Sequence, residues 1–96
     1  MLMHTITEKV PGGKLVRLKI DTELGVIRKM QIAGDFFLHP EETIDDIERA
    51  LVGITVEQDV WVVAAIITSV LEQKNAQFIG VTAGDLARLI MQAVKQ

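Results

Sequence analysis

The sequence changes character at the stretch Ile32–Ala33–Gly34–Asp35–Phe36–Phe37–Leu38–His39–Pro40–Glu41–Glu42. An alternation of apolar and polar residues, which is typical of a strand, stops there at a Gly-Asp pair. Two phenylalanines follow, and then a Pro-Glu-Glu segment typical of a helix start, because proline and acidic residues are favoured in the first helical turn. The stretch therefore predicts a corner between a strand and a helix. The adjacent rings of Phe36 and Phe37 either pack in the core or form a docking point.

Strands are predicted on the N-terminal side of this corner. Thr5–Val10 alternates weakly and ends at Pro11–Gly12–Gly13, which indicates a short first strand and a turn. The clearest strand comes next, because its apolar residues alternate with charged ones. The apolar side of this second strand carries Val16, Leu18 and Ile20.

The following segment is predicted to return antiparallel to the second strand. A four-residue loop at Thr22–Gly25 leads into a third strand over Val26–Ala33, and Gly25 supplies the positive φ that such a loop often needs. Arg28 breaks the apolar side of this strand, which otherwise carries Val26, Met30 and Ile32. The sequence therefore predicts a hairpin that ends at the corner.

Two helices are predicted directly after the corner. Thr43–Leu51 has an apolar stripe on one side, its acidic residues, Glu48 among them, face water, and Gly53 ends it. A second helix is predicted over Val56–Gln73, because Thr55 and Gln58 have the spacing of a capping box. A helical wheel leaves three apolar residues on the polar side of this helix: Trp61, Val62 and Ala65.

The last part of the chain predicts a short extended piece at Asn75–Gly80 and a third helix capped by Thr82 and Asp85. The inward side of that helix carries Leu86, Leu89, Ile90, Ala93 and Val94. Strands come first and helices later, which indicates an α+β fold with three helices on one face of a small antiparallel sheet of two or three strands.

Composition limits the classes of protein that this chain can belong to. Its 96 residues predict one domain spanning residues 1–96, and a hydrophobic fraction of 49% predicts leftover apolar surface. The longest apolar run, Val60–Ile67, is too short to cross a bilayer, and no signal peptide is visible, so we expect a cytoplasmic protein. The absence of cysteine excludes thiol chemistry, and a net charge of −3 argues against nucleic acid.

Candidate catalytic groups are few. His4 and His39 lie far apart in the sequence without a metal-ligand pattern, so we expect no metal site. The acidic pairs Glu41–Glu42 and Asp45–Asp46 are more typical of helix-dipole partners than of an acid–base pair. Pro11–Lys14 precedes a strand, so it predicts a plain turn and no phosphate loop. We therefore expect no catalytic residues in this chain.

Two interaction surfaces are predicted. A basic patch is expected where Arg17, Lys19 and Lys29 share the outer face of neighbouring strands, although such a patch is also typical of a solvated, edge-protecting face. Trp61 on a polar helix face is typical of an interface anchor, and burial beneath a terminal segment is its alternative.

Three motifs, taken together, resemble one known family. They are Val10–Val16, the corner Ile32–Glu42 and the closing stretch Ile79–Ala87, of which the corner is the most specific. Their order and spacing are similar to those of the accessory, C-terminal-type domain of lipoate-protein ligase. The resemblance covers nearly the whole chain. It implies a fold related to that of the iron–sulfur scaffold and sulfur-acceptor proteins, the SufE/NifU type, although this chain lacks their cysteines.

The resemblance implies a function in a complex. In that family a larger domain carries the catalytic residues, activates lipoate with ATP to lipoyl-adenylate, and transfers the lipoyl group to a lysine of an acceptor domain. The small domain is in some organisms a separate polypeptide, needed for activation, and the chain is expected to form such a heterodimer. ATP and lipoate are thus expected only in the complex, with none bound by this chain alone.

The corner is the expected contact with the catalytic subunit. Gly34 would allow the bend, Asp35 would accept hydrogen bonds, and Phe37 would reach the partner. Phe36 shares the strand side of Ile32, so it is expected in the core or at the contact. The full set of predicted contact residues is Gly34, Asp35, Phe36, Phe37, His39 and Trp61.

Two other functions remain open from the sequence. A stand-alone module could bind RNA or an acidic protein through Arg17, Lys19 and Lys29, and its binding would weaken steeply with salt. A homodimer could bury the leftover apolar surface on itself.

Overall fold

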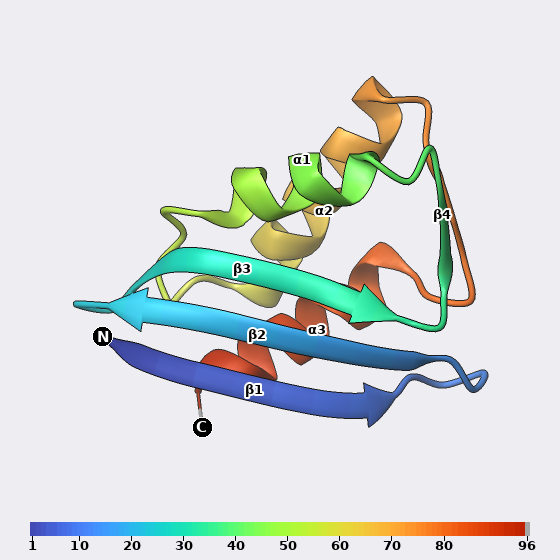
Figure 1. Cartoon of the computed structure of the whole chain (residues 1–96). Coiled ribbons are helices and arrows are strands. Elements are labelled where there is room, and N and C mark those ends of the chain that lie inside the picture. The colour runs from blue at the N-terminus through green and yellow to red at the C-terminus, as the bar shows by residue number, and fades with distance from the viewer. Residues whose placement is uncertain (96) are drawn as a thin grey trace.

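The computed structural model describes residues 1–95 and has two antiparallel sheets and three helices (Figure 1). The larger sheet has the order β1-β2-β3 and is formed by β1 (Leu2–Lys9), β2 (Leu15–Glu23) and β3 (Val26–Gly34). A separate two-stranded ribbon is formed by β4 (Phe37–His39) and β5 (Gln77–Ile79). The helices are α1 (Thr43–Leu51), α2 (Val60–Gln73) and α3 (Ala83–Val94). The predicted α+β class is therefore confirmed.

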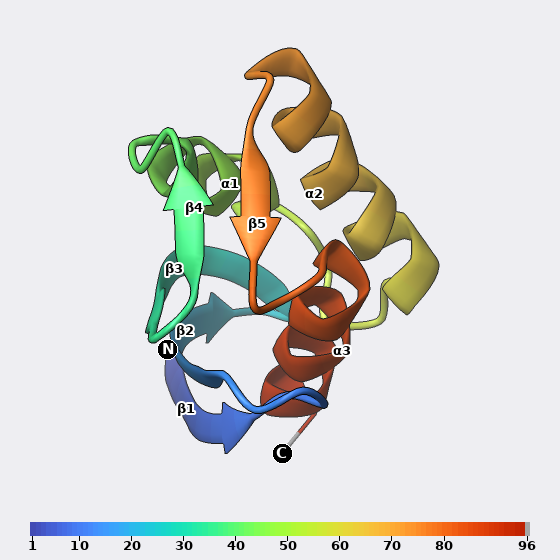
Figure 2. The same cartoon turned by 90° about the vertical axis from the view of Figure 1, so that its right-hand side faces the viewer.

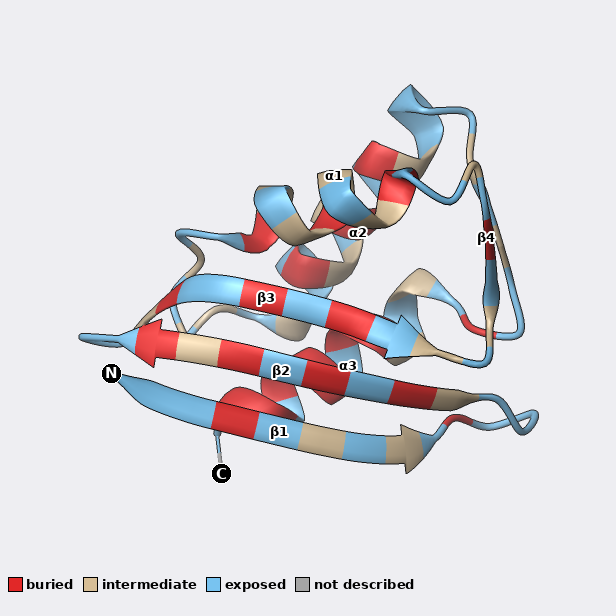
Figure 3. Ribbon diagram, viewed as in Figure 1, coloured by how far each residue is buried: buried red, intermediate tan, exposed pale blue. Residues whose placement is uncertain are grey.

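The core lies between the larger sheet and the helices. α1 packs on β3, α3 packs on β1 and β2, and α2 packs against both of these helices, so all three lie on the same side of the sheet (Figures 1 and 2). Figure 3 shows the alternation that results, with buried and exposed residues following each other along β2. The largest fully buried side chains include Leu18, Ile20, Ile27, Ile47, Leu51, Ile67, Leu86, Leu89 and Ile90.

The hairpin forms where the sequence predicts it, with two differences. Its loop is the two-residue turn Leu24–Gly25, and both residues have positive φ, which matches the twist of the flanking strands. The register shifts within the hairpin, because Lys29 pairs with Asp21 while Ile27 pairs with Thr22. Arg28 is thus the extra residue of a bulge, and Ile27 is buried where the simple alternation predicts Val26.

The second helix begins later than predicted. The segment from Gly53 to Val56 runs alongside the start of β3, where the amide of Ile27 donates to the carbonyl of Ile54 at 2.9 Å and Thr55 forms a bridge with Val26. Thr55 therefore does not cap the helix, because it is held against β3 and the helix begins only at Val60. The cap is Asp59, whose carboxylate accepts a hydrogen bond from the amide of Trp61 at 2.8 Å.

The first helix has the predicted bounds, but Pro40 and Glu48 differ from the prediction. Pro40 lies in a turn that precedes the helix and is not its first residue, since the helix starts at Thr43. Glu48 was expected to face water, yet its carboxylate accepts a hydrogen bond from the backbone amide of Ile32 at 2.7 Å. This bond supplies a partner on the outer edge of β3, which no other strand covers.

The third helix agrees with the sequence in detail. Thr82 and Asp85 form a reciprocal capping box, and the five residues predicted to face inward are all buried. The extended piece before it is the strand β5. None of the helices within residues 1–95 combines the length and apolar character that a membrane span requires.

Candidate docking surfaces

The corner between β3 and β4 depends on a close backbone approach at Gly34. A Cβ atom at this position would lie 2.2 Å from the carbonyl oxygen of Leu15 and 2.9 Å from the ring of Phe36. The next residue, Asp35, donates its backbone amide to the same carbonyl at 3.0 Å. Only glycine leaves room for this contact, so the corner is fixed against the start of β2.

The segment that joins β1 to β2 is fixed at the same end of the molecule (Figure 2). The amide of Val10 donates to the carbonyl of Lys14 at 2.9 Å, which closes the loop between the strands. The aliphatic part of Lys14 lies over Gly80, where a Cβ atom would come within 2.5 Å of its Cγ. The three motifs that are far apart in the sequence therefore meet around the corner and the ribbon.

The ribbon has one inward and one outward side. Leu38 is buried, and the ring of Phe36 meets the ring of Phe78 edge to face with 5.6 Å between the centroids. On the outward side the strand register places Phe37 opposite Ile79, with exposed fractions of 67% and 57%. Figure 2 shows both strands at the front, uncovered by any other element. We call this outward side the ribbon face, and its residues are Phe37, His39, Gln77 and Ile79.

The predicted corner residues occupy different positions around the ribbon face. Phe37 and His39 are on it and exposed, whereas Phe36 is half-buried on the inner side. Asp35 is exposed in the turn, and Gly34 is half-buried at the bend. An open hollow adjoins them, lined in part by Phe36, Phe37, Glu41 and Ile44.

Sequence reasoning missed the two ribbon-face residues on β5. Ile79 and Gln77 are 42 and 38 residues away from their partners Phe37 and His39, so only strand pairing brings them together. An available signal was the position of Ile79 beside Gly80 in a short extended piece, where an apolar residue has little to bury it.

Trp61 is exposed, with 78% of its surface accessible, so burial beneath a terminal segment is wrong. It borders a hollow whose other lining residues, Val60, Ala64, Gly84 and Arg88, come from α2 and α3, and none comes from the corner. The connection from β5 to α3 joins the two places, because Gly84 follows Ile79 by five residues. Trp61 therefore lies outside the ribbon face, beside the first turns of α3, the helix that follows β5 in the sequence.

The predicted basic residues share the outer face of the larger sheet. Arg17, Lys19 and Lys29 are all exposed, and the strand register places Lys19 opposite Gln31 and Arg17 opposite Ala33. We call this surface the basic face, and its residues are Thr5, Thr7, Arg17, Lys19, Lys29 and Gln31.

The candidate catalytic groups are engaged in structural contacts or face solvent. His4 is buried and lies 3.0 Å from the hydroxyl of Thr22 through its Nε2 atom, while His39 is exposed. Asp46 forms ion pairs with Arg49 and, at 3.9 Å, with Lys74. Across residues 1–95, no three His, Cys, Asp or Glu side chains are grouped so that they could hold a metal ion.

One carboxyl group has a shifted pKa. Burial raises the pKa of Glu48 above its ordinary value of 4.5, the hydrogen bond from the amide of Ile32 opposes this rise, and the nearby charge of Asp45 adds to it. Glu48 lies on α1, and the hydrogen bond that it accepts from the amide of Ile32 ties α1 to β3 three residues before Asp35.

These features define a class of protein: a small α+β domain with one exposed apolar face on the ribbon and one basic face on the larger sheet. A family model described as the C-terminus of bacterial lipoate protein ligase matches residues 2–90. The chain belongs to this family, which confirms the resemblance seen in the sequence.

Two relatives come from Thermoplasma acidophilum. Lipoate-protein ligase A subunit 2 is 33% identical over 57 residues, an alignment that covers 59% of this chain and 60% of that protein's own length. A solved structure has a TM-score of 0.73 and 27% identity, and the match covers 97% of this chain and 94% of the other. That structure belongs to a study of a bi-partite lipoate protein ligase and its E2 lipoyl domain. This solved structure has the same fold as the present chain. A relationship to the SufE/NifU-type fold stays a prediction.

Proposed function

We propose that this chain is the accessory subunit of a bipartite lipoate-protein ligase. It forms a heterodimer with a catalytic subunit, which joins lipoate to ATP to give lipoyl-adenylate and pyrophosphate. The lipoyl group then passes to a lysine of an acceptor domain, and AMP is released. The observation that carries this proposal is the match of almost the whole fold to a chain from a bi-partite ligase study, supported by the family match over residues 2–90.

The ribbon face is the centre of the contact with the catalytic subunit. Phe37 and Ile79 form an apolar pair on a ribbon whose strands have three residues each, and a ribbon of that size has little stability of its own. Burial of this pair by a partner removes apolar surface from water and stabilises the ribbon at the same time. Asp35 and His39 supply polar groups at the rim, and Trp61 extends the contact towards the start of α3.

The chain acts on catalysis through conformation. Docking on the rigid corner orders loops of the catalytic subunit around ATP and lipoate, so that binding energy stabilises the conformation that forms the adenylate. ATP and lipoate are bound in the complex, and the catalytic subunit supplies the reacting groups.

The direct test is lipoate-dependent exchange of pyrophosphate into ATP by the catalytic subunit. We expect exchange to rise with the concentration of this chain and to saturate at one chain per catalytic subunit. Lipoyl-adenylate supplied ready-made should reduce the dependence on this chain, because the activation step is then bypassed. Equal exchange rates with and without the chain would show that it has no accessory role in activation.

A further inference from the structure

We propose that the basic face is a second docking surface, which receives an acidic surface of the acceptor domain during lipoyl transfer. This inference rests on the proposed function. The ligase reaction involves two other proteins, the catalytic subunit and the acceptor domain, and the inference assigns the acceptor domain to the basic face. The ribbon face holds the catalytic subunit throughout, whereas the basic face meets a substrate protein that leaves after each turnover.

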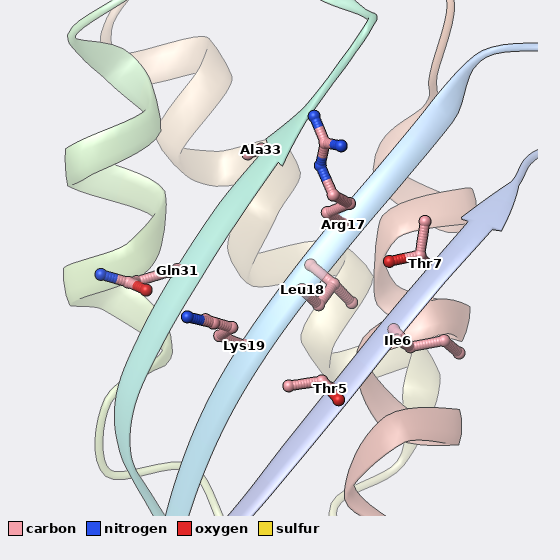
Figure 4. Close-up of a pocket in the computed structure, with 8 residues that line it drawn as sticks. All are labelled: Thr5, Ile6, Thr7, Arg17, Leu18, Lys19, Gln31 and Ala33. Carbon is pink, nitrogen blue, oxygen red and sulfur yellow. The ribbon is translucent and has the colours of Figure 1, made fainter.

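The basic face carries projecting cations around a shallow hollow, which the apolar side chains of Ile6 and Leu18 also line. Figure 4 shows Arg17 and Lys19 rising from β2 between Thr5 and Thr7 on one side and Gln31 and Ala33 on the other. Because the flanking residues are small or uncharged, a hollow of about 280 Å³ lies between them. The basic face therefore offers hydroxyl, amide and cationic groups to a partner, with the two cations of β2 at its centre.

Protection of a sheet edge accounts for Lys29, which lies on the edge strand β3, but it does not explain the charges of Arg17 and Lys19. Arg17 and Lys19 lie on β2, which is the central strand and has a hydrogen-bonded neighbour on each side. Lysine on an edge strand discourages pairing with other chains, but a central strand needs no such protection. Two cations at i and i+2 on one face also repel each other. An approaching acidic surface would relieve that repulsion.

The three cations are free to engage a partner. The ion pairs formed within residues 1–95 are Arg49–Asp46, Lys74–Asp46 and Arg88–Asp85, all outside the larger sheet. Arg17, Lys19 and Lys29 are therefore without an intramolecular ion pair, although Asp21 is the direct strand partner of Lys29. The chain as a whole has a net charge of −3, so the positive charge of this face is local.

The chemistry of the face favours a protein over nucleic acid. Recognition of single-stranded RNA relies on aromatic side chains that stack with bases. The four aromatic residues of the chain, Phe36, Phe37, Trp61 and Phe78, lie at the corner, on the ribbon and on α2. A face with projecting cations is typical of fast and short-lived association steered by electrostatics. This kind of association suits an acceptor domain, which must bind and leave once per lipoyl group.

The two proposed surfaces are adjacent, which fits transfer within one complex. Arg17 pairs with Ala33, and Ala33 is followed directly by the corner residues Gly34 and Asp35. An acceptor domain on the basic face would therefore lie beside the catalytic subunit on the ribbon face.

The test uses the reconstituted ligase with an E2-type lipoyl domain as the acceptor. The variant Arg17→Gln/Lys19→Gln/Lys29→Gln removes the charge of the basic face. A matched control, Arg49→Gln/Lys74→Gln/Lys95→Gln, removes the same charge from exposed positions on the helical side. Circular dichroism melting of both variants establishes that they fold.

Two reactions are measured with each protein. We expect the basic-face variant to raise the KM for the acceptor domain about tenfold at low salt, and the difference to shrink as salt screens the charges. Lipoate-dependent pyrophosphate exchange and binding of the catalytic subunit should equal those of the wild-type chain. The control variant should show the wild-type KM.

Several results would overturn the inference. An unchanged KM would exclude the basic face from acceptor binding, and an equal rise in the control would show a general charge effect. Loss of pyrophosphate exchange would instead place the catalytic subunit on this face. Loss of binding to poly(U) with an unchanged KM would favour RNA. Failure of the proposed function has a different signature, because the wild-type chain itself would then have no effect on exchange.

Discussion

The two sheets of this domain differ in the polarity of the face that no helix covers. The larger sheet exposes Arg17, Lys19 and Lys29 with threonine and glutamine, whereas the small ribbon exposes Phe37 opposite Ile79. A sheet that is stable by itself has a polar outer face, because apolar groups there gain nothing from folding. Under the proposed function, the apolar pair on a ribbon with three-residue strands is the part of the domain that the catalytic subunit completes.

The largest effect is expected where the ribbon joins the larger sheet. Gly34→Ala should destabilise the fold by about 4 kcal/mol, because the added methyl group overlaps the carbonyl of Leu15. Gly12→Ala is the matched control, since Gly12 has a φ of 96° but no atom within 4 Å of an added Cβ, and it should cost about 1–2 kcal/mol. Urea unfolding measures both. Equal urea unfolding midpoints for the two variants would mean that the backbone at the corner shifts to accommodate the methyl group without loss of stability.

The next effect concerns the apolar pair of the ribbon face. Phe37→Ala/Ile79→Ala should weaken binding of the catalytic subunit about 100-fold, as expected for residues at the centre of an interface. Stability should change little, because both side chains are mostly exposed in the isolated chain. Leu24→Ala is the control, since Leu24 is 91% exposed in the hairpin turn at the opposite end of β3. Calorimetric titration that gives the same affinity for both variants would remove the ribbon face from the interface.

A smaller effect is expected at Trp61, and its size tests how far the contact extends beyond the ribbon face. Trp61→Ala should weaken the same association about fivefold, because the ring lies beside the start of α3 and is not at the centre of the contact. A loss as large as that of the ribbon-face variant would move the centre of the interface to α2 and α3. The same titration measures both.

The smallest effect is a pH dependence at the edge of β3. Burial raises the pKa of Glu48, so its protonated form is favoured in the folded state. The resulting stabilisation is fully present below the ordinary pKa of 4.5 and is lost as the pH rises through the raised pKa. Glu48→Gln keeps an oxygen that accepts the hydrogen bond from Ile32 but does not titrate.

The wild-type chain should therefore lose stability relative to Glu48→Gln as the pH rises above 4.5. Urea midpoints between pH 4 and pH 7 measure this difference. A difference that is constant over this range would show that Glu48 has the same pKa in the folded and unfolded chain.

The comparison between the two sheets also separates what the sequence predicts from what it does not. The second strand and the third helix follow from local periodicity, since Val16, Leu18 and Ile20 alternate and Thr82 has its capping partner three residues on. The bulge at Arg28 and the extended segment before Asp59 depend on pairing between distant residues, so local patterns misplace them.

The residues of the candidate contact surface also fall into those that local sequence patterns predict and those that they do not. Phe37 is a prediction from strand parity after the corner, and the structure places it on the outside. Its partner Ile79 depends on a pairing across 42 residues, which no local pattern contains. The basic face follows from local alternation, because the strand periods place Arg17 and Lys19 on one side of β2 and Lys29 on the same side of β3 as Gln31.

The most direct test of the central claim is hydrogen exchange of this chain with and without the catalytic subunit. The account predicts that binding slows exchange at the amides of β4 and β5, with little change at the centre of β2. Slowed exchange confined to the larger sheet, with β4 and β5 unaffected, would contradict it.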